Sequence, residues 1–559
     1  MKTQSTLLSR QLRKYSLLAA ASCVFSAMVS FAQPQSSDPM LRAMQAELGR
    51  EKALLVLPGM ERPYFIEYQL DDLTSYEAVA NYGALTREES NHQRVVRVTV
   101  RVGSYTADSS TSRGEGAIAL APRDNNPDAL RYALWTATDM AYKNALQTYA
   151  AKQAALKQFQ TPQMEHDFAE AKPLVHVAPL VAIDLDRNAW KQHIIDASGL
   201  FETAPEVRAA AEQVQYSTAS VRAVAVNRYL VNTEGTVVRQ GYTGYAAGIS
   251  VGGQAPDGMR LSRDNGTTAA DAKELETWPE FRKRVITDIK SLQALRAAPV
   301  VPAEDYHGPI LFSGDAASDV MSRLFVPNIE ADRPAMGTTA RTTGVYASSY
   351  KSRVLPAILN VTDDPLMTKF AGKTLLGAYA VDDEGVPAQS VKVVVKGMLQ
   401  NYLVGREPVR DFPSSNGHGR SAPGQAAQSR ASVIIVKSSE AVPVSELNKR
   451  LLAMAKDQGR DVYAVETLGG ALEPRVLYRV HPDGSRELVR GAVFDELDNR
   501  SLRSDIVAVG NDDYVDNSLG PVPQTMIAPS MLFDDVGVKR AVEEQQKLPY
   551  YPPPPLDKK

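Results

Sequence analysis

The chain has 559 residues, of which 44% are hydrophobic and 23% are charged. This length suggests two to four domains of roughly 150 residues each, and the composition is that of a soluble globular protein. The formal charge of −3 gives no support for a basic nucleic-acid-binding surface. The single cysteine, Cys23, excludes a disulfide scaffold and a multi-cysteine zinc or iron–sulfur site.

Residues 1–32 resemble an export signal. A basic start without acidic residues precedes an apolar run from Tyr15 to Phe31, and small residues at Ser30 and Ala32 suit a signal peptidase. We therefore expect cleavage after Ala32, a periplasmic or secreted protein, and a mature chain without cysteine. A membrane anchor is an alternative, but about 17 moderately apolar residues are marginal for spanning. A lipoprotein signal at Cys23 is the other alternative. No later apolar run is long enough to span, so no membrane span is expected after cleavage.

The next 270 residues or so alternate between helical and strand patterns. Asp38 and Pro39 predict the N-cap and first position of a short helix. Period-2 alternation predicts strands, and period-3.6 spacing predicts helices. The predicted strands cover residues 64–68, 96–102, 220–230 and 236–240, the last two joined by a hairpin turn at 232–235; the predicted helices cover 128–159, 206–214 and 273–295. A helix stop followed by the link Pro299–Pro302 places a domain boundary near residue 300.

The second half is richer in strands. Strands are predicted at residues 390–395, 399–404, 432–437, 476–480 and 487–490. One helix is predicted to begin at a Ser445 cap and to end at Gly459. Residues 406–428 form a long loop rich in Gly, Ser, Pro and Asn, and the proline-rich tail is expected to be extended or disordered.

Few local patterns suggest catalysis. No two of the seven histidines lie closer than ten residues, so no pair can face a metal from one helix. The segment Gly248–Gly252 matches the pattern around a nucleophilic serine, but the Gly- and Pro-containing residues after it cannot start the helix that this motif needs. We interpret it as a chance match in a strand. Ala371–Thr374 resembles the end of a phosphate loop, but Met367 replaces its first glycine.

Several ordered blocks in the second half carry a family resemblance. Asp382–Gln389 reads D-D-E-G-V-P-A-Q and is followed by Lys396–Leu403, by the N-G-H-G-R loop at Asn416–Arg420, and by a terminal block at Ala528–Val536. Together they resemble the TldD/PmbA family of metallopeptidase-related proteins over about residues 300–540. The resemblance implies a two-domain α+β protein whose second domain is a curved, mostly antiparallel sheet that pairs with another subunit around an internal cavity.

The same resemblance points to a lost metal site. Catalytic TldD-type subunits carry an H-E-x-x-x-H helix and a later cysteine ligand. Against that motif, Gly314 stands for the first histidine, Asp315 for the glutamate and Asp319 for the second histidine. Glycine offers no side-chain ligand, and a lone carboxylate pair is a poor zinc site. We therefore expect no metal, no other cofactor and no catalytic residue. The two aspartates are interpreted as solvating or capping their helix, with binding of a harder cation as the alternative.

The predicted fold class is a two-domain α+β TldD/PmbA-like fold. It comprises a signal peptide (1–32), a lead-in and first helix (33–62), an N-terminal strand–helix–strand domain (63–299), a β-rich C-terminal domain (300–546) and a proline-rich tail (547–559).

The predicted function is that of an exported, zinc-less, non-catalytic subunit of a proteolytic or peptide-processing assembly. The expected partners are a second copy or a TldD-type catalytic subunit, together with peptide or unfolded protein, and no nucleic acid. One alternative is an active peptidase whose atypical metal centre uses Asp315, Asp319 and a distant His307 or His418. Another is a stand-alone peptide-binding protein of the cell envelope.

Overall fold

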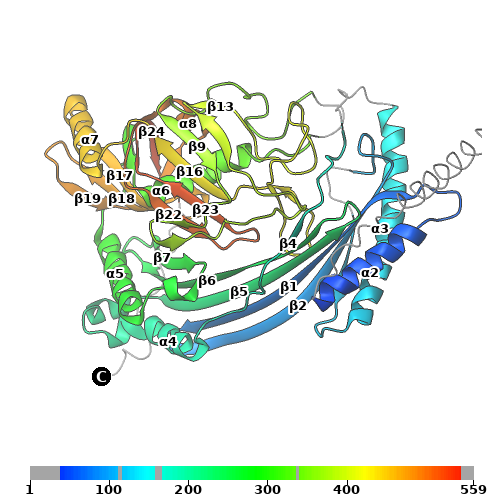
Figure 1. The fold of residues 1–559 in the computed structure, drawn as a ribbon. Helices are drawn as coiled ribbons and strands as arrows, with labels where there is room; N and C mark the ends of the chain where they lie inside the picture. Colours follow the sequence, from blue (N-terminus) through cyan, green and yellow to red (C-terminus); the bar gives the residue numbers. More distant parts are fainter. Residues whose placement is uncertain (1–37, 111–115, 158–165, 335–338, 543–559) are drawn as a thin grey trace, which may run out of the picture.

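The structure is a computed structural model that describes residues 38–110, 116–157, 166–334 and 339–542. The predicted signal peptide and the predicted proline-rich tail lie outside the described residues. The described chain forms an N-terminal part built on a long curved sheet and a C-terminal part of two smaller sheets that lies over the concave side of the curved sheet (Figure 1). The α+β, two-domain fold class is therefore confirmed.

The curved sheet organises the N-terminal part. Its strands run in the order β3-β2-β1-β5-β6-β4, and β7 also pairs with β6. They are β1 (Pro63–Asn81), β2 (Ala84–Val102), β3 (Ala117–Ala121), β4 (Val175–Val177), β5 (Tyr216–Asn232), β6 (Val237–Gln254) and β7 (Arg260–Ala269). All pairs are antiparallel except β4 with β6. Two long hairpins, β1–β2 and β5–β6, thus form the centre of the sheet, and both extend well beyond the strands predicted from sequence.

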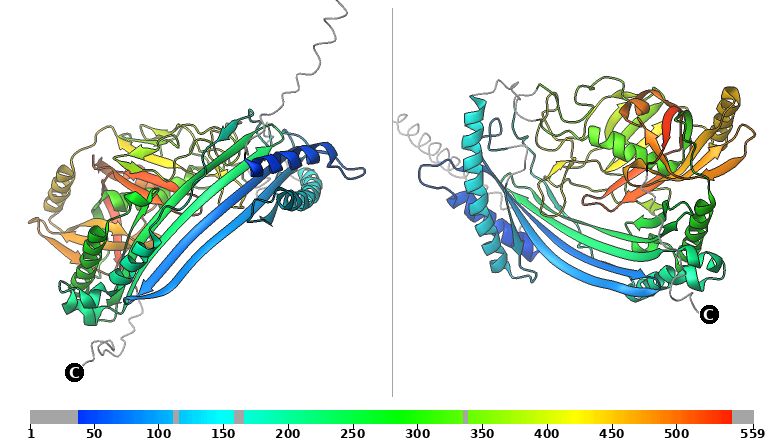
Figure 2. Two further views of the ribbon diagram at one scale, coloured as in Figure 1. Left: turned by 60° about the horizontal axis from the view of Figure 1, so that its bottom comes forward. Right: turned by 180° about the vertical axis from the view of Figure 1, so that it is seen from behind.

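Helices cover the convex face of this sheet. They are α2 (Pro39–Leu54), α3 (Pro127–Leu156), α4 (Arg187–Thr203) and α5 (Trp278–Ala297), of which α5 lies toward the C-terminal part (Figure 2). The Asp38 side chain caps α2 by accepting hydrogen bonds from the amides of Met40 (2.8 Å) and Leu41 (3.1 Å). The apolar residues of β1 lie on this convex face. Those in the first half of the strand pack against α2 and α3, and those in the second half pack against α4. The opposite face of β1 is left for the C-terminal part. No helix in the described chain is long and apolar enough to cross a membrane.

The C-terminal part contains two sheets. The first has the order β13-β12-β9-β16-β23-β22 and the second the order β19-β18-β17-β8-β24-β20, with β21 also pairing with β24. The strands of the first are β9 (Leu359–Asp363), β12 (Val391–Val395), β13 (Met398–Leu399), β16 (Val433–Ser438), β22 (Tyr514–Ser518) and β23 (Gln524–Ala528). Those of the second are β8 (Tyr306–Phe312), β17 (Val462–Leu468), β18 (Pro474–Val480), β19 (Arg486–Val489), β20 (Ala492–Asp495), β21 (Ile506–Val509) and β24 (Met531–Arg540). Only β16–β23 and β8–β17 are parallel among these pairs, so the mostly antiparallel character predicted for this domain is confirmed.

Short elements complete the C-terminal part. The helices are α6 (Gly314–Val320), α7 (Val444–Gln458) and α8 (Asn499–Ser504), and two small ladders pair β10 (Lys369–Phe370) with β11 (Lys373–Thr374) and β14 (Gly419–Arg420) with β15 (Gln428–Ser429). The buried residues of α6 share one apolar core with both sheets, whereas α7 packs on the outer face of the second sheet. The helix α6 is therefore fixed at the centre of this part (Figure 1).

Several sequence predictions need correction. The predicted helix at 206–214 is a six-residue 3₁₀ helix (Arg208–Gln213), and the true helix just before it, α4, was not predicted. The helix predicted from residue 273 begins at Trp278, because Thr277 and Glu280 form a capping box there. The strand predicted at 399–404 is reduced to β13. The helix α7 begins at Val444 after an N-cap at Pro443 rather than at Ser445.

Candidate functional site

The residues that the sequence analysis aligned with the metal motif, Gly314, Asp315 and Asp319, all lie on α6. Asp315 and Asp319 are one turn apart on this helix and face β22, which carries Asp516. Burial raises the pKa of Asp315 to about 6, and the charges of Asp319 and Asp516 add to the rise. Burial also raises the pKa of Asp319 to about 6, although Arg323, 3.8 Å away, opposes it. The two predicted residues are thus together, in an acidic cluster that favours retention of a proton.

Gly314 leaves no room for a side chain. A Cβ atom built on Gly314 would lie 2.7 Å from Cβ of Tyr514 and 3.3 Å from the carbonyl oxygen of Ala528. Real Cβ contacts are not this short, so the β22 backbone would have to move before any side chain could stand here. The space that a metal-binding histidine would need is occupied by the first residue of β22.

Zinc does not fit the donor set around α6. His307 is near the start of β8, at the opposite end of that strand from α6, and lies 4.0 Å from Asp535. His418 is fully buried, where Nδ1 is 3.0 Å from the Asn416 carbonyl oxygen and Nε2 is 3.6 Å from Asp363. Neither imidazole joins Asp315, and across the described ranges no three His, Cys, Asp or Glu side chains are grouped to hold a metal ion.

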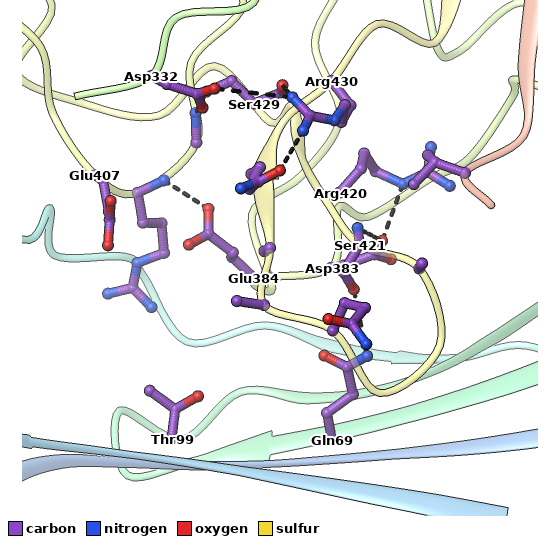
Figure 3. Close-up of a pocket in the computed structure, with 18 of the residues that line it drawn as sticks. Gln69, Thr99, Asp332, Asp383, Glu384, Glu407, Arg420, Ser421, Ser429 and Arg430 are labelled. Atoms are coloured by element: carbon purple, nitrogen blue, oxygen red, sulfur yellow. Dashed lines mark hydrogen bonds and ion pairs between the residues drawn. The ribbon is translucent and has the colours of Figure 1, made fainter. Parts of the chain in front are cut away.

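A cavity of about 910 Å³ lies between the two parts of the chain. Residues on the concave face of β1 and β2, including Glu67 and Thr99, form its floor. Phe168, the turn between β22 and β23 around residues 518–524, and loops of the C-terminal part around residues 332, 383, 406 and 421–430 form the rest (Figure 3). We call this space the interdomain cavity. Its volume lies within the range of about 300–1,000 Å³ that is usual for ligand pockets.

A buried ion-pair network joins the two parts beside this cavity. Arg228 of β5 pairs with Asp71 of β1 at 2.6 Å and also with Asp383 of the C-terminal part. Arg420 lies 3.1 Å from the same Asp383 carboxylate. Burial alone would raise the pKa of Asp383, but Arg228 and Arg420 hold it below its ordinary value. Asp383 is therefore a charged group that fixes the C-terminal loops against the curved sheet.

Arg406 provides a second connection. It is fully buried, and its Nε and Nη2 donate to the carbonyl oxygen of Ala169 at 2.9 and 2.7 Å. Nη2 also donates to Glu234 at 2.6 Å, and the guanidinium lies 4.1 Å from the ring centroid of Phe168. Its positive charge is thus already balanced within the protein.

Two carboxylates face the interdomain cavity from opposite sides. Glu67 extends from β1, and Glu384 from the loop after Asp383. Burial raises the pKa of Glu67 to about 7; Arg406 opposes this rise and Glu384 adds to it. Burial likewise raises the pKa of Glu384, against a hydrogen bond from the Arg406 amide at 2.6 Å. The cavity therefore holds two acids that resist ionisation when no cation is beside them.

The sequence analysis did not find this cavity. Glu384 lies in the D-D-E-G block that carries the family resemblance, but the block itself does not say what its carboxylates face. Glu67, Gln69 and Asp71 alternate with the apolar residues at positions 66, 68 and 70, which indicates one polar face of a strand. That pattern cannot tell whether the polar face meets water or another domain. This alternation of polar and apolar residues was the sequence signal available for the floor of the cavity.

Comparisons with known proteins identify what the chain resembles. Residues 305–540 match the family model described as "PmbA/TldA metallopeptidase C-terminal domain". No curated protein matches the chain. The solved structure of TldE from Thermococcus kodakarensis superposes with a TM-score of 0.59 at 14% identity, covering 89% of this chain and 99% of that one.

Two further solved structures share the fold. A putative modulator of a DNA gyrase from Thermotoga maritima gives a TM-score of 0.58 at 17% identity, over 89% of this chain and 99% of that chain. A putative modulator of DNA gyrase from Bacteroides thetaiotaomicron gives 0.57 at 12% identity, over 90% and 98%. At these identities the likeness establishes the fold, which extends over both parts of the chain.

Proposed function

The chain belongs to the TldD/PmbA family, whose C-terminal domain it carries at residues 305–540, and from this membership we propose that it is an exported, non-catalytic subunit of a peptide-processing assembly. The family is metallopeptidase-related. The proposal gives this chain the role of holding peptide, while a metal-bearing relative performs the cleavage.

The closure of the metal position at Gly314 carries this proposal. Restoring the motif would require more than a change of residue type, because Cβ of Tyr514 stands 2.7 Å from where the new Cβ would be. This packing supports a role for α6 that does not require a metal ion.

The interdomain cavity supports the peptide-holding role. It is large enough for a few residues of extended chain and is lined by both polar and aromatic side chains. The edge strand β3 flanks it: Ile118 pairs with Arg97, which lines the cavity, and Ile118 and Leu120 are 49% and 70% exposed. Since β3 pairs only with β2 among the described strands, its other edge can accept an extended peptide by strand addition.

The proposed partner is a TldD-type subunit that carries the H-E-x-x-x-H helix. Family resemblance supports this pairing, and a homodimer is the alternative assembly. Export is proposed from the basic and apolar residues before Ala32. Mass spectrometry of protein purified from its native cell tests the export step, because cleavage after Ala32 predicts a chain that begins at Gln33.

The central experiment combines metal content with activity. The full-length chain is produced with zinc in the medium, its bound metal is measured by plasma mass spectrometry, and cleavage of unfolded casein is followed with and without chelator. We expect near-zero metal and no cleavage by the chain alone. Stoichiometric metal with chelator-sensitive cleavage, both lost in Asp315→Ala, would instead establish the atypical metallopeptidase.

A tagged chain recovered from its native cell then tests the assembly. Recovery of a relative with an H-E-x-x-x-H helix, and chelator-sensitive cleavage by that complex, is the expected result. Peptide binding by the chain without any such relative would instead favour the stand-alone envelope peptide-binding protein.

A further inference from the structure

We propose that Glu67 and Glu384 form a binding site for a primary ammonium group of a peptide, supplied by its N-terminus or by a lysine side chain, within the interdomain cavity. This inference rests on the proposed peptide-holding function and names the chemical group that the cavity selects. It also gives a role to Glu384, the third acidic residue of the D-D-E-G block.

The first argument is the distribution of charge in the cavity. Most charged side chains that line it already have an opposite charge nearby: Arg420 with Asp383 at 3.1 Å, Arg333 with Asp167 at 2.8 Å, Arg406 with Glu234 at 2.6 Å, Arg430 with Glu330 at 3.1 Å and Arg101 with Asp108 at 3.0 Å. Glu407 and Asp332 lie 3.5 and 3.9 Å from Arg101 and Arg430. Glu67 and Glu384 differ from all of these, because among the described residues neither forms an ion pair with a Lys, Arg or His side chain within 4.0 Å.

The second argument is that Glu384 is held in place by its surroundings. Its Oε2 accepts the Arg406 amide at 2.6 Å. A Cβ atom at Gly419 would lie 2.1 Å from the same Oε2, and one at Gly405 would lie 2.7 Å from it. Two glycines thus leave the space that this carboxylate occupies. Figure 3 shows Glu384 above Thr99 and Gln69 of the curved sheet, with the dashed bond to the Arg406 amide. One oxygen is fixed by the protein, and Oε1 has no described hydrogen-bond partner.

The third argument concerns Glu67 on the floor of the cavity. The only described hydrogen bond of the Glu67 carboxylate is a long one, 3.5 Å, from Nδ2 of Asn232. Burial raises the pKa of Glu67, and the charges of Glu384 and Glu234 add to the rise, whereas Arg406 opposes it. The Nε and Nη2 of Arg406 donate to Ala169 and Glu234, and no described hydrogen bond joins this guanidinium to Glu67. A bound cation would stabilise both carboxylates in their charged form.

A primary ammonium fits this arrangement better than a metal ion. It carries three N–H donors, and two carboxylates and one hydroxyl can accept them. The hydroxyl is available, because Thr99 pairs directly with Glu67 in the β1–β2 ladder and also lines the cavity. Calcium would need six to eight oxygen ligands, which two carboxylates do not provide.

Calorimetric titration of the full-length chain at pH 7.5 tests the inference. Three tetrapeptide amides serve as probes: tetra-alanine with a free N-terminus, its N-acetylated form, and an N-acetylated peptide with one alanine replaced by lysine. We expect the first, the third or both to bind about tenfold or more tightly than the neutral peptide, since charge-assisted hydrogen bonds are strong. The pattern identifies which ammonium is selected.

Matched variants separate the site from the general charge of the cavity. Glu67→Gln and Glu384→Gln should each remove the tenfold preference, whereas Glu407→Gln, which removes a charge from the same cavity, should retain it. Binding should also release protons near pH 7 in the wild-type chain and fewer in Glu67→Gln, which titrations in buffers of different ionisation enthalpy measure. Thermal unfolding establishes that each variant is folded.

The outcomes distinguish this inference from the function on which it rests. Equal affinity for all three peptides, or an equal loss in Glu407→Gln, would overturn the ammonium site and leave the peptide-holding function standing. If folded wild-type chain bound none of the peptides, the peptide-holding function itself would fail, and the inference with it.

Discussion

Gly314 at the start of α6 faces the first residue of β22, Tyr514, so closely that a Cβ atom at Gly314 would lie 2.7 Å from Cβ of Tyr514. The contact involves the Cβ of Tyr514 and not its ring, so no change of the Tyr514 rotamer can relieve it. The α6–β22 distance is therefore set for glycine at this position.

This contact predicts a specific pattern of stabilities. Gly314→Ala should lower the free energy of unfolding by about 1–3 kcal/mol, the usual cost of overpacking a core. Adding Tyr514→Gly should give a favourable coupling in a double-mutant cycle, because it removes the opposing Cβ. Adding Tyr514→Ala should not, because alanine keeps that atom. Urea unfolding measures all of these variants, and a neutral Gly314→Ala would show that the space is open.

The acidic cluster on α6 predicts a pH dependence. The pKa of Asp315 is raised to about 6 in the folded chain, above the ordinary value near 3.8. The folded state therefore binds the proton more tightly, and the stabilisation present below about pH 4 is lost as the pH rises toward 6. Asp315→Asn should weaken this dependence, leaving the part that Asp319 contributes, and be more stable than wild type at pH 8 by about 1–2 kcal/mol.

Chemical denaturation at several pH values from 4 to 8 checks that prediction. Asp139→Asn is the control, because Asp139 is an exposed carboxylate on α3 paired only with Lys143 at 2.6 Å. A loss of stability at pH 8 in Asp315→Asn would mean that a cation normally pairs with this carboxylate.

The ion pairs of Arg228 predict how the two parts of the chain depend on each other. Arg228→Met leaves the buried Asp71 carboxylate without its partner and removes one of two arginines from Asp383. Breaking a buried pair in this way costs about 3–5 kcal/mol. Arg282→Met, which removes an exposed pair with Glu206, should cost at most about 1 kcal/mol. Similar small losses in both variants would contradict a structural role for the network.

Local signals predicted the elements that local interactions determine. Asp38 and Pro39 marked the start of α2 because the cap is formed by neighbouring residues. The turn at residues 232–235 marked the β5–β6 hairpin, where Gly235 adopts a φ of +102°. The helix α4 was not predicted, since Trp190 and Ile194 obtain their burial from α5 and the curved sheet rather than from a strong local pattern.

The metal-motif positions and the cavity residues also differ in whether the sequence could predict them. Gly314, Asp315 and Asp319 were singled out from sequence by the family resemblance, whose motif spans a few consecutive residues, and the structure places all three on α6. Glu67 and Glu384 are brought together by a curved sheet and a loop separated by more than about 300 residues, and tertiary contacts of this range leave no local pattern. The filling of the Gly314 position by Tyr514 likewise required coordinates.

The contacts of Arg406 predict that lysine, which carries the same charge, cannot replace it. Its Nε and Nη2 together hold the Ala169 carbonyl oxygen, Nη2 also reaches Glu234, and the planar guanidinium lies 4.1 Å from the Phe168 ring centroid. A lysine carries the same charge on a single nitrogen and cannot make these contacts simultaneously. Arg406→Lys should therefore lower the free energy of unfolding by about 1–3 kcal/mol. Arg500→Lys, at an exposed pair with Asp498, should change it by less than about 0.5 kcal/mol. Equal behaviour of the two variants in urea unfolding would mean that Arg406 acts only as a point charge.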